Sequence, residues 1–202
     1  MAEPGIDDGS GVVLRPAREG DAERWLEMLH DPDHLTYASP AFVTLPTDTA
    51  GLTEHIEKSQ STWEERAPGT LVVTPADDED RFLGNISWRW TTGEKLGIAE
   101  LGYGIHPATR GRGVGRRAIV ALTRWLLSPD GRGLARVQLD HSVENAASCR
   151  VALAAGFERE GIRRGFLPLR DPAAPHGVRR HDVCLHGCTE VPWGSGAARP
   201  LR

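Results

Sequence analysis

The sequence has few lysines, few cysteines and no long apolar run. Of the 24 basic residues in the 202-residue chain, only Lys58 and Lys95 are lysines. No uninterrupted apolar segment approaches the roughly 18 residues that a membrane-spanning helix needs. The three cysteines, Cys149, Cys184 and Cys188, fit no framework of paired disulfides. We therefore expect a reduced, cytoplasmic protein that does not interact with membranes.

The composition is typical of a soluble globular domain, but its charge is unevenly distributed. Apolar residues make up 39% of the chain, charged residues 26%, and the formal net charge is −4. Residues 110–136 carry seven arginines against one acid, whereas residues 1–80 carry 18 acids against five bases. The basic part suits a phosphorylated cofactor and the acidic part an amine substrate, although an arginine-rich codon usage contributes. The acidic total and the short basic run argue against nucleic-acid binding.

The chain is predicted to form one domain with mixed secondary structure. Residues 1–10 are small, polar and acidic, so we expect them to be disordered. Residues 11–187 form the domain, and residues 188–202 form a loose tail rich in glycine, proline and alanine. Hydrophobic periodicity predicts about seven strands and about four helices. The expected fold class is therefore α/β, with a mixed, mostly antiparallel sheet.

The most informative stretch is residues 100–117, where an apolar strand leads into a turn and then a helix. The turn, residues 110–115, reads Arg-Gly-Arg-Gly-Val-Gly. Glycines allow φ > 0 and close approach of a ligand, and the N–H groups at the start of a helix bind anions. No Gly-Lys-Ser/Thr follows, and the glycine spacing of dinucleotide-binding folds is not met. We interpret the turn as a cradle for a pyrophosphate group.

Further motifs surround this turn: Gly102-Tyr103 before it, then Asn145-x-x-Ser148, Gly156-Phe157 and Arg180-x-Asp182. Together with the turn, they resemble the GNAT superfamily of acyl-CoA-dependent N-acyltransferases over residues 12–186. The likeness is closer to the Rim-type ribosomal-protein N-acetyltransferase subgroup. The resemblance implies a GNAT-like fold, acetyl-CoA as co-substrate, and an acceptor that is a primary amine of a protein N-terminus or a small molecule. A succinyl-CoA or other acyl-CoA donor, a non-catalytic acyl-CoA-binding sensor and a homodimer all stay open.

The resemblance also implies which residues hold acyl-CoA. In such folds the central strand splays from the next one, and its backbone holds the pantetheine arm. The predicted cofactor residues lie on that strand, on the turn and at the starts of two helices: Tyr103, Gly104, Ile105, His106, Arg110, Gly111, Arg112, Gly113, Val114, Gly115, Arg116, Asn145 and Ser148.

Three residues are candidates for catalysis. Glu100 is the candidate base, because it shares a strand face with two glycines that leave room for a substrate; its alternative role is a structural salt bridge. His141 is a second candidate for proton transfer. Many GNAT enzymes place a tyrosine, the acid for the leaving thiolate, where this chain has Ala152. Ser148 or a water is expected to replace it, although Ser148 could equally be a helix-capping residue.

The candidate acceptor-binding residues are Tyr37, Trp88 and Glu100. Tyr37 lies in the loop 32–46, which borders the acceptor groove in GNAT-like folds, and Trp88 lies on an aromatic strand face. Core packing is the alternative for both aromatic residues. A group of zinc-type side chains occurs late in the chain: His181, Cys184, His186 and Cys188. Alternate positions on one strand cannot easily surround an ion, so we predict no metal site.

Overall fold

A computed structural model describes residues 5–190 of the chain. The strands in this part are β1 (Ile6–Asp7), β2 (Val12–Arg15), β3 (Thr70–Pro75), β4 (Gly84–Trp90), β5 (Ile98–Ile105), β6 (Arg136–Ser142), β7 (Glu158–Arg170) and β8 (Val178–Cys188). The α-helices are α1 (Ala22–Leu29), α2 (Pro32–Tyr37), α3 (Thr53–Glu64), α4 (Val114–Leu127) and α5 (Ala146–Ala154).

The strands form a single sheet in the order β1-β2-β3-β4-β5-β6-β8-β7. Every neighbouring pair is antiparallel except β5 and β6, which run parallel. This confirms the expected α/β fold with a mixed, mostly antiparallel sheet. The described part has one strand and one α-helix more than predicted, because β1 and the six-residue α2 lie in segments that were expected to be irregular.

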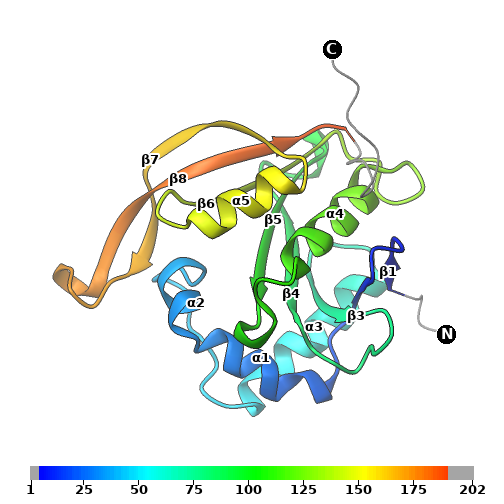
Figure 1. Ribbon diagram of the computed structural model, residues 1–202, viewed down its shortest axis with the longest axis horizontal. Helices are drawn as coiled ribbons and strands as arrows, with labels where there is room; N and C mark the ends of the chain where they lie inside the picture. The colour runs from blue at the N-terminus through cyan, green and yellow to red at the C-terminus, as the bar shows by residue number, and fades with distance from the viewer. Residues whose placement is uncertain (1–4, 191–202) are drawn as a thin grey trace.

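Helices cover both faces of the sheet (Figure 1). On one face, the apolar sides of α4 and α5 pack onto alternate residues of the central strands, such as Val73, Leu101 and Leu139. On the other face, α1 and α3 pack around Val72 and Phe82. Because side chains alternate along a strand, neighbours such as Val72 and Val73 enter opposite cores.

The feature that positions the site is the separation of β5 from β6. The two strands pair only over Ile98–Leu101 and Arg136–Leu139. Beyond these residues β5 continues to Ile105 and β6 to Ser142 without pairing with each other, while β6 stays paired with β8 on its other edge from Val137 to Ser142. The sheet is therefore opened at its centre, as expected from the resemblance to GNAT enzymes.

The two ends of the domain differ slightly from expectation. Ile6 is buried and pairs with Leu14, so part of the segment expected to be disordered is a strand. β8 extends to Cys188, the first residue of the predicted tail. Residues 191–202 of that tail and residues 1–4 lie outside the described residues. No helix in the described part is long and apolar enough to cross a membrane.

Candidate active site

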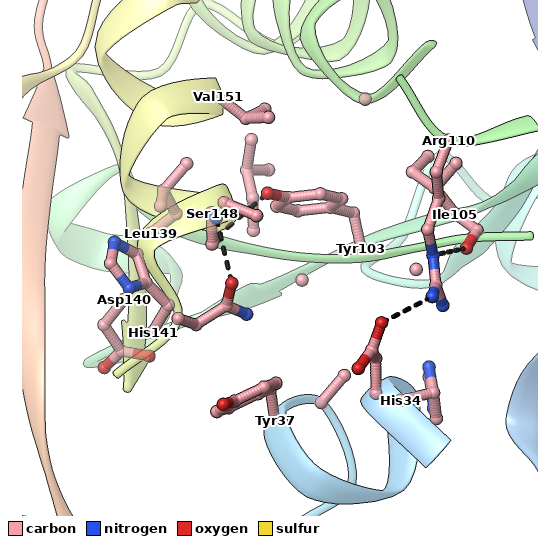
Figure 2. A pocket seen from close by; sticks show the side chains of 18 of the residues that line it. His34, Tyr37, Tyr103, Ile105, Arg110, Leu139, Asp140, His141, Ser148 and Val151 are labelled. Atoms are coloured by element: carbon pink, nitrogen blue, oxygen red, sulfur yellow. Dashed lines mark hydrogen bonds and ion pairs between the residues drawn. The ribbon is translucent and has the colours of Figure 1, made fainter. Parts of the chain in front are cut away.

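A pocket of about 690 Å³ lies beside the opening between β5 and β6. Its walls come from α2, β5, the turn before α4 and the first residues of α4, β6, α5, and one residue each of β4 and β7. Figure 2 shows side chains from these segments around one space, with Tyr103 and Ser148 on one side and Tyr37 of α2 on the other. The pocket therefore joins segments that are far apart in the sequence.

One end of the pocket is the glycine-rich turn, which the sequence predicts to hold the cofactor. Gly113 immediately precedes α4 with a φ of 73°, and Gly111 has a φ of 76°. Among the described residues, no side chain caps the first turn of α4. Its N–H groups can therefore bind an anion. A Cβ on Gly115 would lie 3.4 Å from both Ile105 and Tyr103, so α4 approaches β5 closely at this point.

Arg110, a predicted cofactor residue, lies at the pocket but is engaged with α2. Its guanidinium donates to Asp33 at 2.9 Å, to Asp31, and to the backbone carbonyl of Ile105 at 3.1 Å. Figure 2 shows this guanidinium between β5 and α2. Arg110 therefore holds α2 against the end of β5, which differs from the predicted contact with the cofactor.

The other two predicted cofactor arginines differ in position. Arg116 lines the pocket and donates to the carbonyl of Ala154 at 2.9 Å, which links α4 to α5. Arg112 is exposed and lies outside the pocket wall. Of the three arginines predicted to bind the cofactor, Arg110 and Arg116 therefore line the pocket and Arg112 does not.

Attachment of α2 changes the titration of two residues. Burial raises the pKa of Asp31, but the hydrogen bond and positive charge of Arg110, together with hydrogen bonds from the backbone N–H groups of His34 and Asp33, outweigh this effect, and the pKa lies below its usual value. Burial lowers the pKa of His34 to about 4, against the attraction of Asp31 and with a contribution from Arg110. His34 is therefore uncharged at neutral pH.

Two carboxylates from neighbouring strands face the pocket. Glu100 on β5 is buried, forms an ion pair with Arg89, and accepts from Gln138 at 3.4 Å. Asp140 on β6 forms an ion pair with Arg163 at 3.3 Å. Burial and the nearby charge of Glu100 raise the pKa of Asp140. Both roles considered for Glu100 thus remain open, since it is salt-bridged and also lines the pocket.

Tyr103 and Ser148 form a hydroxyl pair in the pocket. The phenol oxygen of Tyr103 lies 3.0 Å from Oγ of Ser148, and Figure 2 shows the ring pointing at the start of α5. Burial raises the pKa of Tyr103, so its hydroxyl keeps its proton at neutral pH. The side chain of Asn145 accepts from the backbone N–H of Ser148 at 3.0 Å. Asn145 is therefore the N-cap of α5, and the Ser148 hydroxyl is directed at Tyr103.

His141 also lines the pocket, at the end of β6. Its Nδ1–H donates to the carbonyl of Ser142 at 2.8 Å, and its ring stacks on that of His186 with centroids 5.0 Å apart. Burial lowers the pKa of His141. The ring is thus held in one orientation as a neutral imidazole.

Besides Arg112, two of the predicted site residues are not brought to the pocket. His106 is buried behind β5, where it contacts Glu27 at 2.9 Å and Arg24 at 3.1 Å. Trp88 lies in the core beneath α4, against Trp90. The His106 side chain faces α1, and the Trp88 side chain faces α4. Neither side chain therefore reaches the pocket.

The structure adds residues that sequence reasoning missed. Asp140 of β6, Arg89 of β4 and Asp33 of α2 all line the pocket. Tyr103 was predicted to contribute backbone groups, whereas its hydroxyl also faces the pocket. Asp140 could have been found from its position at the carboxyl end of the strand that follows the central one. No local pattern marks Arg89.

The fold and the pocket together define an acyl-CoA-dependent transferase. The sequence model of the Acetyltransferase (GNAT) domain matches residues 12–158. The chain therefore belongs to the GNAT acetyltransferase family, and it is an N-acetyltransferase that uses acetyl-CoA as co-substrate. The family predicted from the sequence motifs is confirmed.

Solved structures share this fold at low sequence identity. Ribosomal-protein-S5-alanine acetyltransferase from Vibrio fischeri has a TM-score of 0.74 and 17% identity, with 94% of this chain and 98% of that chain covered. Mycobacterium smegmatis RimJ, solved with CoA-disulfide, has a TM-score of 0.73 and 21% identity, with 88% and 81% covered. Spermidine N-acetyltransferase from Vibrio cholerae, solved with CoA and spermine, has a TM-score of 0.68 and 19% identity, with 89% and 96% covered. No curated protein matches the sequence of this chain.

Proposed function

We propose that this enzyme acetylates a primary amine that reaches the thioester from the α2 side of the pocket. The observation that carries the proposal is the continuity of the pocket from the turn before α4 to the carboxylates Glu100 and Asp140. Pyrophosphate at the turn directs the pantetheine arm along residues 102–105, which β6 leaves unpaired. The Vibrio cholerae and Mycobacterium smegmatis structures, which contain CoA species, support this use of the fold.

Glu100 is the proposed base in this reaction. It reaches the pocket from the strand that would hold the thioester, and Arg89 forms an ion pair with its carboxylate. The proton passes from the amine to the carboxylate directly or through a water. Asp140, one strand away, adds a second negative charge that attracts an ammonium group to this end of the pocket.

The hydroxyls of Tyr103 and Ser148 are the proposed source of the proton for the leaving thiolate. They lie 3.0 Å apart on the wall between β5 and α5. Because Ala152 occupies the position of the usual tyrosine, a phenol that reaches the pocket from β5 offers a replacement. His141 lies on the same wall, and its unpaired Nε2, which can take up a proton and pass it on, makes it the alternative relay that we retain.

The acceptor class stays open between a protein N-terminus and a small amine. Tyr37 of α2 lines the side from which the acceptor enters, together with Asp33. Spermine in the Vibrio cholerae structure and the ribosomal-protein substrate named for the Vibrio fischeri protein are precedents for the two classes. Acetyl-CoA is the donor of the acyl group, and succinyl-CoA is the alternative donor whose rate of transfer should be compared with it.

Thiol release from acetyl-CoA tests the proposal directly. The acceptor panel should contain polyamines, amino acids, aminoglycosides and short peptides with free or blocked N-termini, and mass spectrometry should locate the acetyl group on each product. We expect release with at least one free amine and none with its blocked analogue. Tight binding of acetyl-CoA without release for any amine would favour an acyl-CoA sensor.

Two further properties are proposals as well. The described cysteines Cys149, Cys184 and Cys188 are all free thiols, which supports the cytoplasmic location expected from the sequence. A homodimer is the second, and sedimentation at several protein concentrations would test it. Neither property is needed for the chemistry of the pocket.

A further inference from the structure

Three potential metal ligands meet beneath the start of α5. They are His141 of β6, Cys149 of α5 and His186 of β8, and one ligand atom of each lies within 4.8 Å of those of the other two. Figure 1 shows α5 lying across the strands that carry the two histidines. The cluster thus joins three elements that only the tertiary structure brings together.

The two imidazoles are buried, and their hydrogen bonding is incomplete. His141 is 5% exposed and His186 is fully buried. Among the described residues, Nε2 of His141 and Nδ1 of His186 have no hydrogen-bond partner. An unpaired buried polar atom costs about 1–3 kcal/mol. The unpaired Nε2 of His141 therefore points to a partner that is not a protein side chain, and the nitrogen that His186 offers to the cluster is Nε2, which faces Sγ of Cys149.

The ligand types favour a zinc-like cation over a water. Two imidazoles and a thiolate are typical zinc ligands, and three protein ligands leave a fourth position open. Nδ1–H of His141 donates to the carbonyl of Ser142, which leaves the lone pair of Nε2 available to a metal. A backbone carbonyl commonly orients a zinc-bound histidine in this way.

The separations need little adjustment. Tetrahedral zinc with ordinary bond lengths places nitrogen and sulfur ligands roughly 3.4–3.6 Å apart. Sγ of Cys149 lies 3.8 Å from Nε2 of His186, and no pair in the cluster exceeds 4.8 Å. Small side-chain rotations close these gaps. Cys149 is only partly buried and His141 lines the pocket, which provides a route for the ion.

We propose that His141, Cys149 and His186 form a binding site for Zn²⁺ or a similar soft divalent cation. The Cys149 thiol releases its proton to solvent, because the thiolate is the ligand. The open fourth position takes a water. The ion joins α5 to β6 and β8; acetyl transfer does not require it. Of the four late residues considered from the sequence, only His186 belongs to the site.

Two of the remaining late residues have other partners. Nδ1 of His181 lies 2.8 Å from Oγ of Ser142. The Cys188 thiol donates to the carbonyl of Glu190 at 3.0 Å. Cys188 is therefore a matched control for Cys149: both are free cysteines, but only one belongs to the cluster.

Cobalt binding tests the site without reference to activity. The metal-free protein should be titrated with Co²⁺, which takes tetrahedral sites and reports a thiolate ligand by a charge-transfer absorption in the near ultraviolet. We expect one equivalent to produce this absorption in the parent and in Cys188→Ser, and none in Cys149→Ser. His186→Gln should weaken binding by roughly tenfold or more, since loss of even an outer partner costs 10-fold to 100-fold.

Thermal unfolding with Zn²⁺ supplies a second readout. Zn²⁺ should raise the Tm of the parent and of Cys188→Ser but not that of Cys149→Ser, because a ligand stabilises only the state that binds it. Circular dichroism of the metal-free variants verifies that they fold. The proposal is overturned if the parent shows no thiolate absorption at stoichiometric Co²⁺, or if Cys184→Ser or Cys188→Ser abolishes it while Cys149→Ser retains it.

Discussion

The two ends of the pocket are built in different ways. The cofactor end comes from one continuous stretch, residues 103–116, and consists largely of backbone around a helix start. The acceptor end needs side chains from α2, β5 and β6, held in place by ion pairs such as Arg110–Asp33 and Arg163–Asp140. A backbone site can thus be recognised from local sequence, whereas a side-chain site depends on contacts between distant segments.

The largest expected effect is at the cofactor end. Gly113→Asp places a side chain at a φ of 73°, which costs about 1–2 kcal/mol, and adds a negative charge where the phosphates bind. We expect the Kd for CoA in calorimetry to rise about 100-fold or more. Gly133→Asp is the matched control, since Gly133 has a φ of 62° on an exposed turn far from the pocket. Equal weakening by both variants would mean that the cradle lies elsewhere.

The next effect concerns chemistry at the acceptor end. Glu100→Gln keeps the shape of the side chain but removes the base, so turnover should fall about 100-fold while the Kd for CoA stays within about twofold. The loss should shrink as the pH rises, because more amine is then neutral without help. Asp130→Asn, on an exposed turn, controls for the change in net charge. Turnover within a few-fold of the parent at neutral pH would assign Glu100 to structure alone.

A smaller effect is expected where the two ends meet. Tyr103→Phe removes the phenol that contacts Ser148, and turnover should fall about tenfold. Ser148→Ala should cause a similar loss, and the double variant should lose little more, because the two hydroxyls act as one unit. Single-turnover measurements separate chemistry from product release. Fully multiplicative losses would show that the two hydroxyls act independently.

The next variant tests whether Arg110 supports the acceptor end of the pocket or binds the phosphates at the cofactor end. The hydrogen bonds of Arg110 to Asp31 and Asp33 assign it to the support of α2. Arg110→Ala should therefore raise the KM of the acceptor roughly five-fold to tenfold and leave the Kd for CoA within about twofold. A tenfold rise in the Kd for CoA would instead assign Arg110 to the phosphates.

The smallest effect is the pH response of α2. The unfolded His34 takes up a proton near pH 6.5, whereas the folded residue does so only near pH 4. The unfolded state therefore binds more protons between these values, and stability falls as the pH drops through this window. We expect His34 to contribute about 1 kcal/mol to the loss of unfolding free energy between about pH 7 and 5.

Urea unfolding at both pH values measures this contribution. His34→Gln should lose less stability than the parent on acidification, by about the same 1 kcal/mol. His30→Gln, an exposed histidine at the end of α1, should behave like the parent. A His34→Gln variant with the parent's pH dependence would show that α2 does not bury this ring in solution.

The sequence alone determined the parts of this protein that depend on local physics. Strand and helix periodicities predicted the α/β class, and the glycine-rich residues 110–115 predicted a turn that opens a helix. These features could be read because a residue at φ > 0, a helix N-terminus and an apolar face are properties of a short segment. The family followed from the spacing of such segments.

The tertiary structure decided which side chains from those segments meet. Arg110 turned to α2 because two aspartates lie within its reach, and Trp88 entered the core because its strand face lies beneath α4. Asp140 became a pocket residue only because β6 separates from β5 after four paired residues. His141 and His186 meet Cys149 because β8 returns beside β6. Such contacts depend on register and strand order, which no local stretch of sequence specifies.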